Sequence, residues 1–413
     1  MAVDTITETI RRTIIAASPD LHAHARAIEA ARSRRGVSGR TGPAMLAGEA
    51  EGVRGGNLAQ AQSLKLQLER EFVPGSLRVA LLRMDEAEVR QAELARVVAE
   101  QRLSATIDRS LVGLMGWTAV GTRLSAEDSL LASAEVSLRS RFSVGDARYV
   151  DVLRLRTERL RVESERARAF SDALIARREL EGLAGDDATA AIVRALTSQM
   201  MLRDPSLALL TTIPDAPDVD SILERSGQRA LADVPVLRAE AERQRVAAQS
   251  RPRLGGFLGM QRFADDRSFS IGPVLGATMS LTFTAAAAGR ARTYAADREL
   301  DAATARRRAT VGALRAAVLT ARDRFDAARA RMAGYDAALL RGAREERESA
   351  LASYRTGQLS LVELLDFERA LARAEIDRLR SRIDAADALA DLLMAGEHTE
   401  STSTLRASSS DDR

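Results

Sequence analysis

The stretch Tyr354-Arg-Thr-Gly-Gln-Leu-Ser-Leu-Val-Glu-Leu-Leu-Asp-Phe-Glu-Arg369 separates two long helical patterns. Gly357 is its only clear helix breaker, and helical periodicity resumes within a few residues. The stretch therefore predicts a helix, a tight turn and a second helix that runs back along the first.

The segment 142–153, Phe-Ser-Val-Gly-Asp-Ala-Arg-Tyr-Val-Asp-Val-Leu, repeats this pattern earlier in the chain. It has an aromatic residue, a glycine three positions later, then a valine, an acidic residue and two apolar residues. A duplicated turn predicts a duplicated structural unit. The matched pairs are Phe142 and Tyr354, Gly145 and Gly357, Asp151 and Glu363, and Leu153 and Leu365.

The composition is that of long helices rather than of a compact mixed core. Alanine, arginine, leucine and glutamate dominate, and only 3% of the residues are aromatic. The formal net charge is only +3, and basic and acidic residues alternate along the helices, so we expect no nucleic-acid partner. The absence of cysteine excludes disulfides and thiol chemistry.

Four segments with an apolar and polar alternation predict β-strands: 45–53, 62–73, 253–263 and 268–284. In the second, leucines alternate with charged residues, and Arg70 interrupts the apolar face. The fourth would be about 50 Å long at about 3.3 Å per residue, longer than an ordinary globular strand. Its expected lipid-facing residues are Phe269, Ile271, Leu275, Met279, Leu281 and Phe283. A soluble sheet packed on helices is the alternative.

The remaining patterns predict helices. Segment 5–35 is a pair broken at Pro19, and segment 76–141 would reach about 100 Å. Segment 289–354 repeats apolar residues at strict three- and four-residue spacing up to Leu339, which is typical of supercoiled helices. Gly113, Gly116 and Gly121 are expected to be soft spots in the long helix. Further helices are expected at 148–183, in a short segment opened by Pro235, and at 361–394.

The chain is thus expected to be mixed α and β, mostly long helix, with two tandem repeats that each hold two strands and one helical hairpin. The expected boundaries are an N-terminal helical segment 1–18, repeat 1 at 19–185, a connector 186–233, repeat 2 at 234–396 and a disordered tail 397–413.

This order resembles the TolC family of outer-membrane efflux channels over nearly the whole chain. The resemblance implies a homotrimer with a twelve-stranded β-barrel in outer-membrane lipid, continuous with a periplasmic α-helical barrel. The implied partners are a periplasmic adaptor (membrane fusion) protein and an inner-membrane pump of RND or ABC type. The segments that carry it are 142–145 with 150–153, 354–357 with 361–366, and the strand-to-helix junctions 71–75 and 281–283 with 289–290.

The resemblance also assigns roles at the two turns. Asp151, Glu363 and Asp366 are expected at the pore mouth, where a carboxylate ring would attract cations. The alternative is that these carboxylates only stabilise a helix N-terminus. Phe142, Gly145, Tyr354, Gly357 and Leu359 are expected at the tip that closes and docks the adaptor. Many family members have a basic residue where this chain has Leu359, so the family's polar latch is depleted here.

The expected function is a passive exit duct of a tripartite efflux or type I secretion system. The alternatives are a soluble coiled-coil scaffold and a periplasmic adaptor.

No nucleophile-base pair, phosphate loop or cofactor fingerprint is visible, so neither an enzyme nor a cofactor is expected. His22, His24 and His398 lack metal-ligand spacing. No secretory signal precedes Thr5, so we expect a processed or truncated start of a bacterial outer-membrane protein. No residue encodes the substrate.

Overall fold

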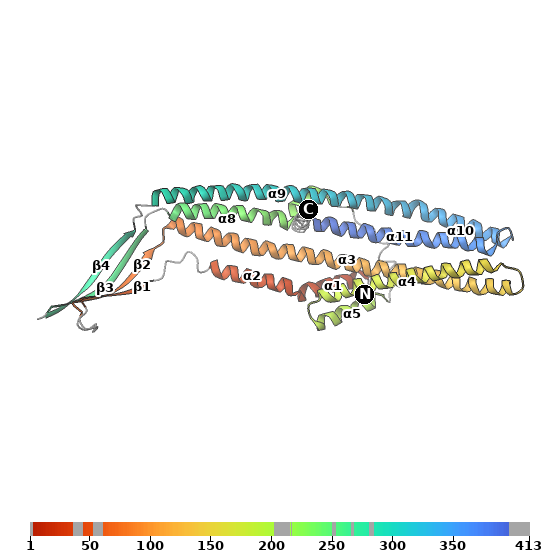
Figure 1. The fold of residues 1–413 in the computed structure, drawn as a ribbon, viewed down its shortest axis with the longest axis horizontal. Helices are drawn as coiled ribbons and strands as arrows, with labels where there is room; N and C mark the ends of the chain where they lie inside the picture. Colours follow the sequence, from red (N-terminus) through yellow and green to blue (C-terminus); the bar gives the residue numbers. More distant parts are fainter. Residues whose placement is uncertain are drawn as a thin grey trace, which may run out of the picture. The chain divides into compact units, whose positions relative to one another are not determined.

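The computed structural model describes residues 3–35, 44–52, 61–201, 215, 217–249, 253–265, 268–280 and 285–395. Predicted positions Leu281, Phe283 and His398 and the tail 397–413 lie outside these residues. The described chain is mostly helical with one small antiparallel sheet (Figure 1). It divides into two compact units, Met1–Ala23 with Arg96–Gln228 and Gly312–Arg413, and His24–Ala95 with Arg229–Val311.

The second unit contains the sheet. Its strands are β1 (Met45–Glu51), β2 (Ser63–Phe72), β3 (Arg253–Asp265) and β4 (Ser268–Ser280), in the order β1-β2-β3-β4 with every neighbouring pair antiparallel. The four predicted strands are therefore present, and the predicted ends at 53 and 281–284 lie outside the described residues. Because β2 and β3 pair, the two segments that are far apart in sequence form one sheet.

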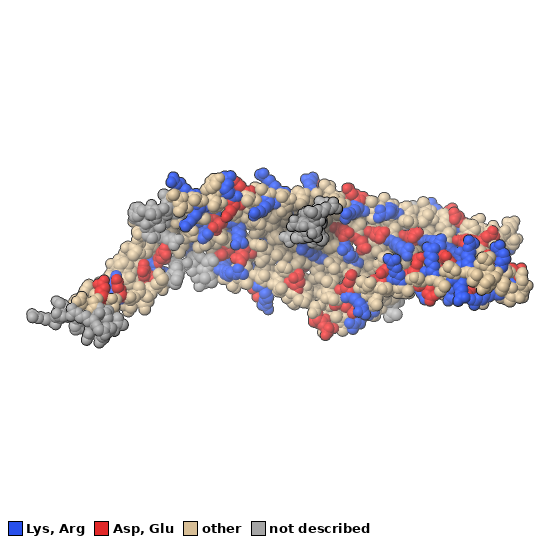
Figure 2. All heavy atoms as spheres, in the orientation of Figure 1, with Lys and Arg blue, Asp and Glu red and all other residues tan. Residues whose placement is uncertain are grey.

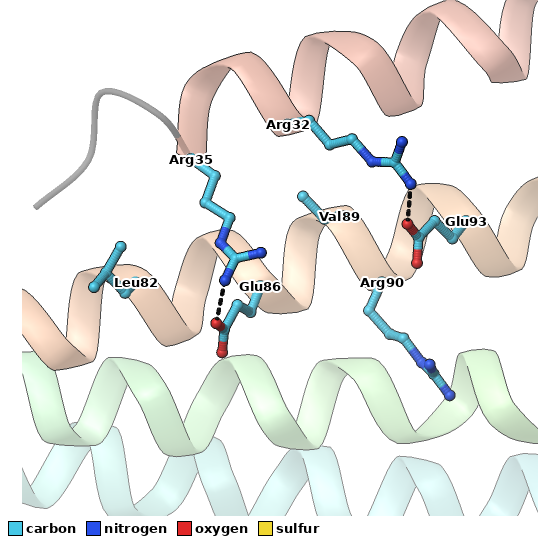
Figure 3. A pocket seen from close by; sticks show the side chains of 7 residues that line it. All are labelled: Arg32, Arg35, Leu82, Glu86, Val89, Arg90 and Glu93. Atoms are coloured by element: carbon cyan, nitrogen blue, oxygen red, sulfur yellow. Dashed lines mark hydrogen bonds and ion pairs between the residues drawn. The ribbon is translucent and has the colours of Figure 1, made fainter.

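Helices flank the strands in sequence. In this unit, α2 (Pro19–Arg35) lies beside the first part of α3 (Gly75–Ser143). Ion pairs join Arg32 to Glu93 and Arg35 to Glu86, each at 2.7 Å (Figure 3). Arg34 also pairs with Glu88. The Arg32–Glu93 and Arg35–Glu86 pairs line a pocket together with Leu82, Val89 and Arg90. The sequence predicts that these charged residues face solvent. Here they form ion pairs that join two helices.

The helix expected to open at Pro235 begins earlier. α8 runs from Gly227 to Gln249 with Pro235 in its interior. A proline removes one backbone hydrogen bond of a helix, and it kinks or breaks many helices at that point. Here Asp233, two residues before the proline, forms an ion pair with Arg307 of α9 (Ala285–Gly334). This contact ties the first turns of α8 to its neighbour.

The first unit is built from helices. α1 (Val3–Ala17) buries Ile6, Ile10 and Ile14 against the middle of α3 and against α4 (Tyr149–Leu183). A second core joins α3, α4 and α11 (Leu361–Ala395). A third joins Leu314, Val318 and Phe325 of α9 to α11 and to the short helix α7 (Val219–Arg225). α5 (Asp187–Met201) adds Val193 and Met200 to the first core.

The strict heptad of α9 ends where the sequence predicts that it continues. Residues Tyr335–Leu339 form the π-helix η2, which leads into α10 (Leu340–Arg355). Since a π-helical turn inserts about one extra residue, the apolar stripe moves by one position. Leu339, expected in the stripe, is 48% exposed, and Leu340 is buried at 4%. The prediction for Leu339 was wrong for this reason.

The glycines of α3 are contact positions in an unbroken helix. A Cβ at Gly116 would overlap the side chain of Ile383 in α11, and one at Gly121 would lie 2.8 Å from the ring of Phe170 in α4. Gly116 and Gly121 therefore allow α11 and α4 to approach α3 closely, and α3 continues through all three expected soft spots.

We expect Gly116→Ala to destabilise the protein by about 1–3 kcal/mol, because the added methyl group overpacks the contact with Ile383. The matched control is Gly312→Ala, in α9, where no atom lies within 4 Å of the added Cβ. That change should stabilise by about 1 kcal/mol through helix propensity. Urea unfolding of both variants measures the contrast, and equal stabilisation by both would contradict the contact.

Candidate functional site: the two helical turns and the face of the sheet

The first turn ends α3 in a defined hydrogen-bond pattern. Gly145 has φ +82°, its N–H donates to Phe142 O at 3.1 Å, and the N–H of Asp146 donates to Arg141 O at 2.8 Å. These two bonds form a Schellman motif, which needs a residue in the left-handed region and so favours glycine. The predicted chain reversal at Gly145 is confirmed.

The second turn has the same geometry. Gly357 has φ +75°, its N–H donates to Tyr354 O at 3.0 Å, and Gln358 N–H donates to Ser353 O at 2.9 Å. Each return helix begins four residues after its glycine, at Tyr149 and at Leu361. The two segments matched by sequence therefore fold into the same local structure.

Glu363 is part of a capping box at the start of α11. Its carboxylate accepts from Ser360 N–H at 2.8 Å, and the Ser360 hydroxyl accepts from Glu363 N–H at 3.3 Å. These bonds, the one from the Ser360 backbone first, lower the pKa of Glu363. Because this pKa is lowered by folding, the stabilisation is present at neutral pH and is lost as the pH falls through the folded-state value.

Asp151 has the corresponding position in α4. Its carboxylate accepts from Arg148 Nε at 3.0 Å, which raises the pKa of Arg148 above its usual value, and its side chain is only 14% exposed. Asp366 is 58% exposed and forms an ion pair with Arg369 at 2.9 Å. Among the three predicted mouth carboxylates, Glu363 and Asp366 are thus exposed, and Asp151 is partly covered.

The structure brings the two turns together. Asp151, Arg154 and Leu155 of α4 line one small cavity with Leu138 of α3 and with Val362, Leu365 and Arg369 of α11. The Arg369 side chain is only 13% exposed and lies on the α11 side of this cavity. A basic residue is therefore present between the hairpins, ten positions after Leu359, and the sequence reasoning missed it.

The first turn also presents exposed apolar and basic side chains. Val144 is 79% exposed, and the rings of Phe142 and Tyr149 are 5.4 Å apart. Matching the two turns residue by residue would have revealed a charge difference. The first turn has exposed arginines at 141, 154 and 156 where the second has Ser353, Asp366 and Glu368.

The other predicted tip residues are half-buried. Tyr354 and Leu359 are both partly covered. Within the described part of the chain, no hydrogen bond of the Tyr354 hydroxyl is found. Basic and acidic side chains lie next to one another over the helices on the face drawn in Figure 2. The selectivity and docking roles of these positions remain predictions.

Ser360→Ala is expected to cost about 1 kcal/mol, because it removes the N-cap of α11. The matched control is Ser349→Ala, an exposed position inside α10. It should change stability by less than about 0.5 kcal/mol. Urea unfolding distinguishes the two, and an equal effect of both changes would mean that the capping box contributes nothing.

One face of the sheet is apolar across all four strands. Residues directly opposite one another in the register share a face, so Leu46, Leu68, Leu258 and Leu275 form one row across the sheet. Leu66, Met260 and Pro273 form the next row, and Leu275 is 80% exposed. Of the predicted lipid-facing residues, Ile271, Leu275 and Met279 are exposed on this face, whereas the side chain of Phe269 lies outside what is described.

The opposite face is polar and rich in small residues. Glu49 lies opposite Lys65, and Gln67 opposite Gly259. Lys65 Nζ lies 5.1 Å from the ring centre of Phe257 on this face. The predicted alternation therefore holds in three dimensions. β1 and β4 are each paired on one side only, so the sheet has two open edges in a single chain.

No described helix is long and apolar enough to cross a membrane. Within the described ranges, no group of three or more His, Asp or Glu side chains is placed to hold a metal ion.

No family model and no curated protein matches the chain. Solved structures do match. A membrane protein from Pseudomonas aeruginosa is 19% identical, covers 95% of this chain and 94% of its own, and has a TM-score of 0.72. The outer-membrane channel OprN is 17% identical, covers 95% and 90%, and has a TM-score of 0.74. The outer membrane protein VceC from Vibrio cholerae is 16% identical, covers 95% of both chains, and has a TM-score of 0.70.

The chain has the fold of outer-membrane efflux channels, with long helices and a small antiparallel sheet. More particularly, it is the fold of the TolC-like outer-membrane factors, as the sequence resemblance predicted.

Proposed function

We propose that the protein is an outer-membrane exit duct of a tripartite efflux or secretion system, which passively conducts substrates delivered by an inner-membrane pump and its adaptor. The observation that carries the proposal is the sheet: one largely apolar face with exposed leucines, one polar face and two open edges. Open edges are not tolerated in lipid, and a four-stranded sheet is too narrow to enclose a pore.

The proposal includes two tandem repeats. The order α2, β1, β2, α3, α4 is followed by α8, β3, β4, α9 with α10, and α11. Both hairpins turn at a glycine in a Schellman motif, which supports a duplicated unit. Three chains would join β4 of one copy to β1 of the next and close a twelve-stranded barrel in the outer membrane. The helical hairpins would then form the periplasmic tunnel.

In this proposal the turns at Gly145 and Gly357 form the periplasmic mouth, where the adaptor docks. The exposed Phe142, Val144 and Tyr149 support a docking role for the first turn. Glu363 and Asp366 are the carboxylates best placed to act on passing ions, because both are exposed. Asp151 would contribute less, because its side chain is only 14% exposed and accepts from Arg148.

Conductance across a planar lipid bilayer tests the function. Folded protein should give discrete channels, and the absence of channels from such protein would refute the duct. If channels form, Glu363→Gln with Asp366→Asn should reduce the preference for cations. The matched control, Glu345→Gln with Glu346→Gln in α10, removes two exposed carboxylates away from the turn and should leave the preference unchanged.

A further inference from the structure

The apolar face of the sheet is interrupted by charge in two rows, and the charged residue in each row is an arginine. Arg262 of β3 lies between Leu64 and Ile271, and Arg70 of β2 lies beside Gly256 and Ala277. Both arginines share the face of Leu66, Leu68 and Leu258, because the register pairs residues of one face only.

The two arginine rows lie on either side of the most apolar part of the sheet. Arg262 is opposite Leu64, six residues before Arg70 on β2, so the rows are about 20 Å apart along the strand. Between them are the rows of Leu66, Met260 and Pro273 and of Leu68, Leu258 and Leu275. A strand tilt of about 45° reduces the separation along the membrane normal to about 14 Å.

Charge on a lipid-facing strand is most costly at the midplane of the membrane and is tolerated near the two interfaces. The apolar belt of an outer-membrane sheet is about 25 Å tall, so each arginine row would lie about 5 Å inside one boundary. An extended arginine side chain spans this distance and carries its guanidinium to the headgroups while its methylene groups stay in lipid.

We propose that Arg70 and Arg262 bind phosphate groups of lipid headgroups, one in each leaflet, and so set the depth of the sheet in the membrane. This rests on the proposed insertion of the sheet. A guanidinium matches phosphate oxygens with paired N–H donors. Arg262 lies near the β3–β4 connection and would bind the outer leaflet, while Arg70 lies five residues before α3 and would bind the inner one.

Arg70 is exposed, and the residues beside it in the register are small. Gly256 and Ala277 in its row have almost no side chain, whereas the adjoining rows carry Leu68 and Phe72. The ring of Phe72 borders this row, because a Cβ at Gly256 would lie 3.5 Å from it.

The test is retention of lipid by the full-length protein in detergent, measured by native mass spectrometry. The added lipids are phosphatidylglycerol, lipid A and, as the zwitterionic reference, phosphatidylethanolamine. We expect preferential retention of the two anionic lipids, and about fivefold weaker retention for each arginine removed by Arg70→Gln or Arg262→Gln. Arg262→Gln should affect lipid A most. Arg70→Lys and Arg262→Lys should retain part of the binding.

Lys65→Gln is the matched control, because it removes one positive charge from the polar face of β2 and should leave lipid retention unchanged. Equal lipid retention by wild type and both glutamine variants would overturn the proposal. An equal loss of the preference for anionic lipids in Lys65→Gln would also overturn it. Displacement by millimolar inorganic phosphate alone would reassign the site to free phosphate. Loss of lipid with intact conductance supports the proposal, and lipid retention without conductance would refute the duct but not the arginine sites.

Discussion

Leu275→Arg is expected to destabilise the membrane-inserted protein by about 2–4 kcal/mol per chain, the cost of an arginine near the middle of a lipid-facing strand. Leu275 lies in the central row of the apolar face with Leu68 and Leu258, and it is 80% exposed in the single chain. If this face met water, replacing so exposed a leucine by arginine would change stability by no more than about 0.5 kcal/mol. The loss of stability on Leu275→Arg therefore shows whether this face contacts lipid or water.

The measurement is the guanidinium unfolding midpoint of protein reconstituted in phosphatidylethanolamine and phosphatidylglycerol vesicles. The matched control is Ser270→Arg, which places the same side chain on the polar face of the same strand. It should be tolerated, because that face would line the lumen. A small effect of Leu275→Arg, or equal effects at the two positions, would show that the apolar face is not in contact with lipid.

Leu340→Ala should cost about 2–5 kcal/mol, whereas Leu339→Ala should cost less than about 0.5 kcal/mol. Leu340 is 4% exposed and Leu339 is 48% exposed, so only the first leaves a cavity when it is truncated. The strict heptad of the sequence predicts the reverse order, because it places Leu339 in the apolar stripe. The pair therefore tests whether the π-helix Tyr335–Leu339 exists in solution.

Thermal or urea unfolding of the two variants under identical conditions gives the comparison. A third variant deletes Ala338 and so removes the extra residue of the π-helix. Leu340 should then occupy the buried position that a regular heptad predicts. A larger loss for Leu339→Ala than for Leu340→Ala would show an uninterrupted α-helix at this point.

Local features of the turns were accessible from sequence. A glycine followed four residues later by a helix start was sufficient to predict both reversals, since a Schellman turn depends on a few neighbouring residues. The capping box of Ser360 and Glu363 is also a short-range signal, and the sequence reasoning considered it only as a helix-dipole alternative. The position of Arg369 beside Asp151 was not accessible, because it depends on how α4 and α11 pack.

By itself, the sequence determined the four strands, the long helices and the two turns. Each follows from a period or a breaker that acts within a few residues, such as the alternation of β4 or the glycine at 357. Only the tertiary structure decided which residues meet. Gly116 and Gly121 weaken an isolated helix, yet they allow α11 and α4 to approach α3, and a π-helical turn moves the stripe of α9 from Leu339 to Leu340. These outcomes depend on contacts between segments far apart in the chain, which compete with local preference and here outweigh it.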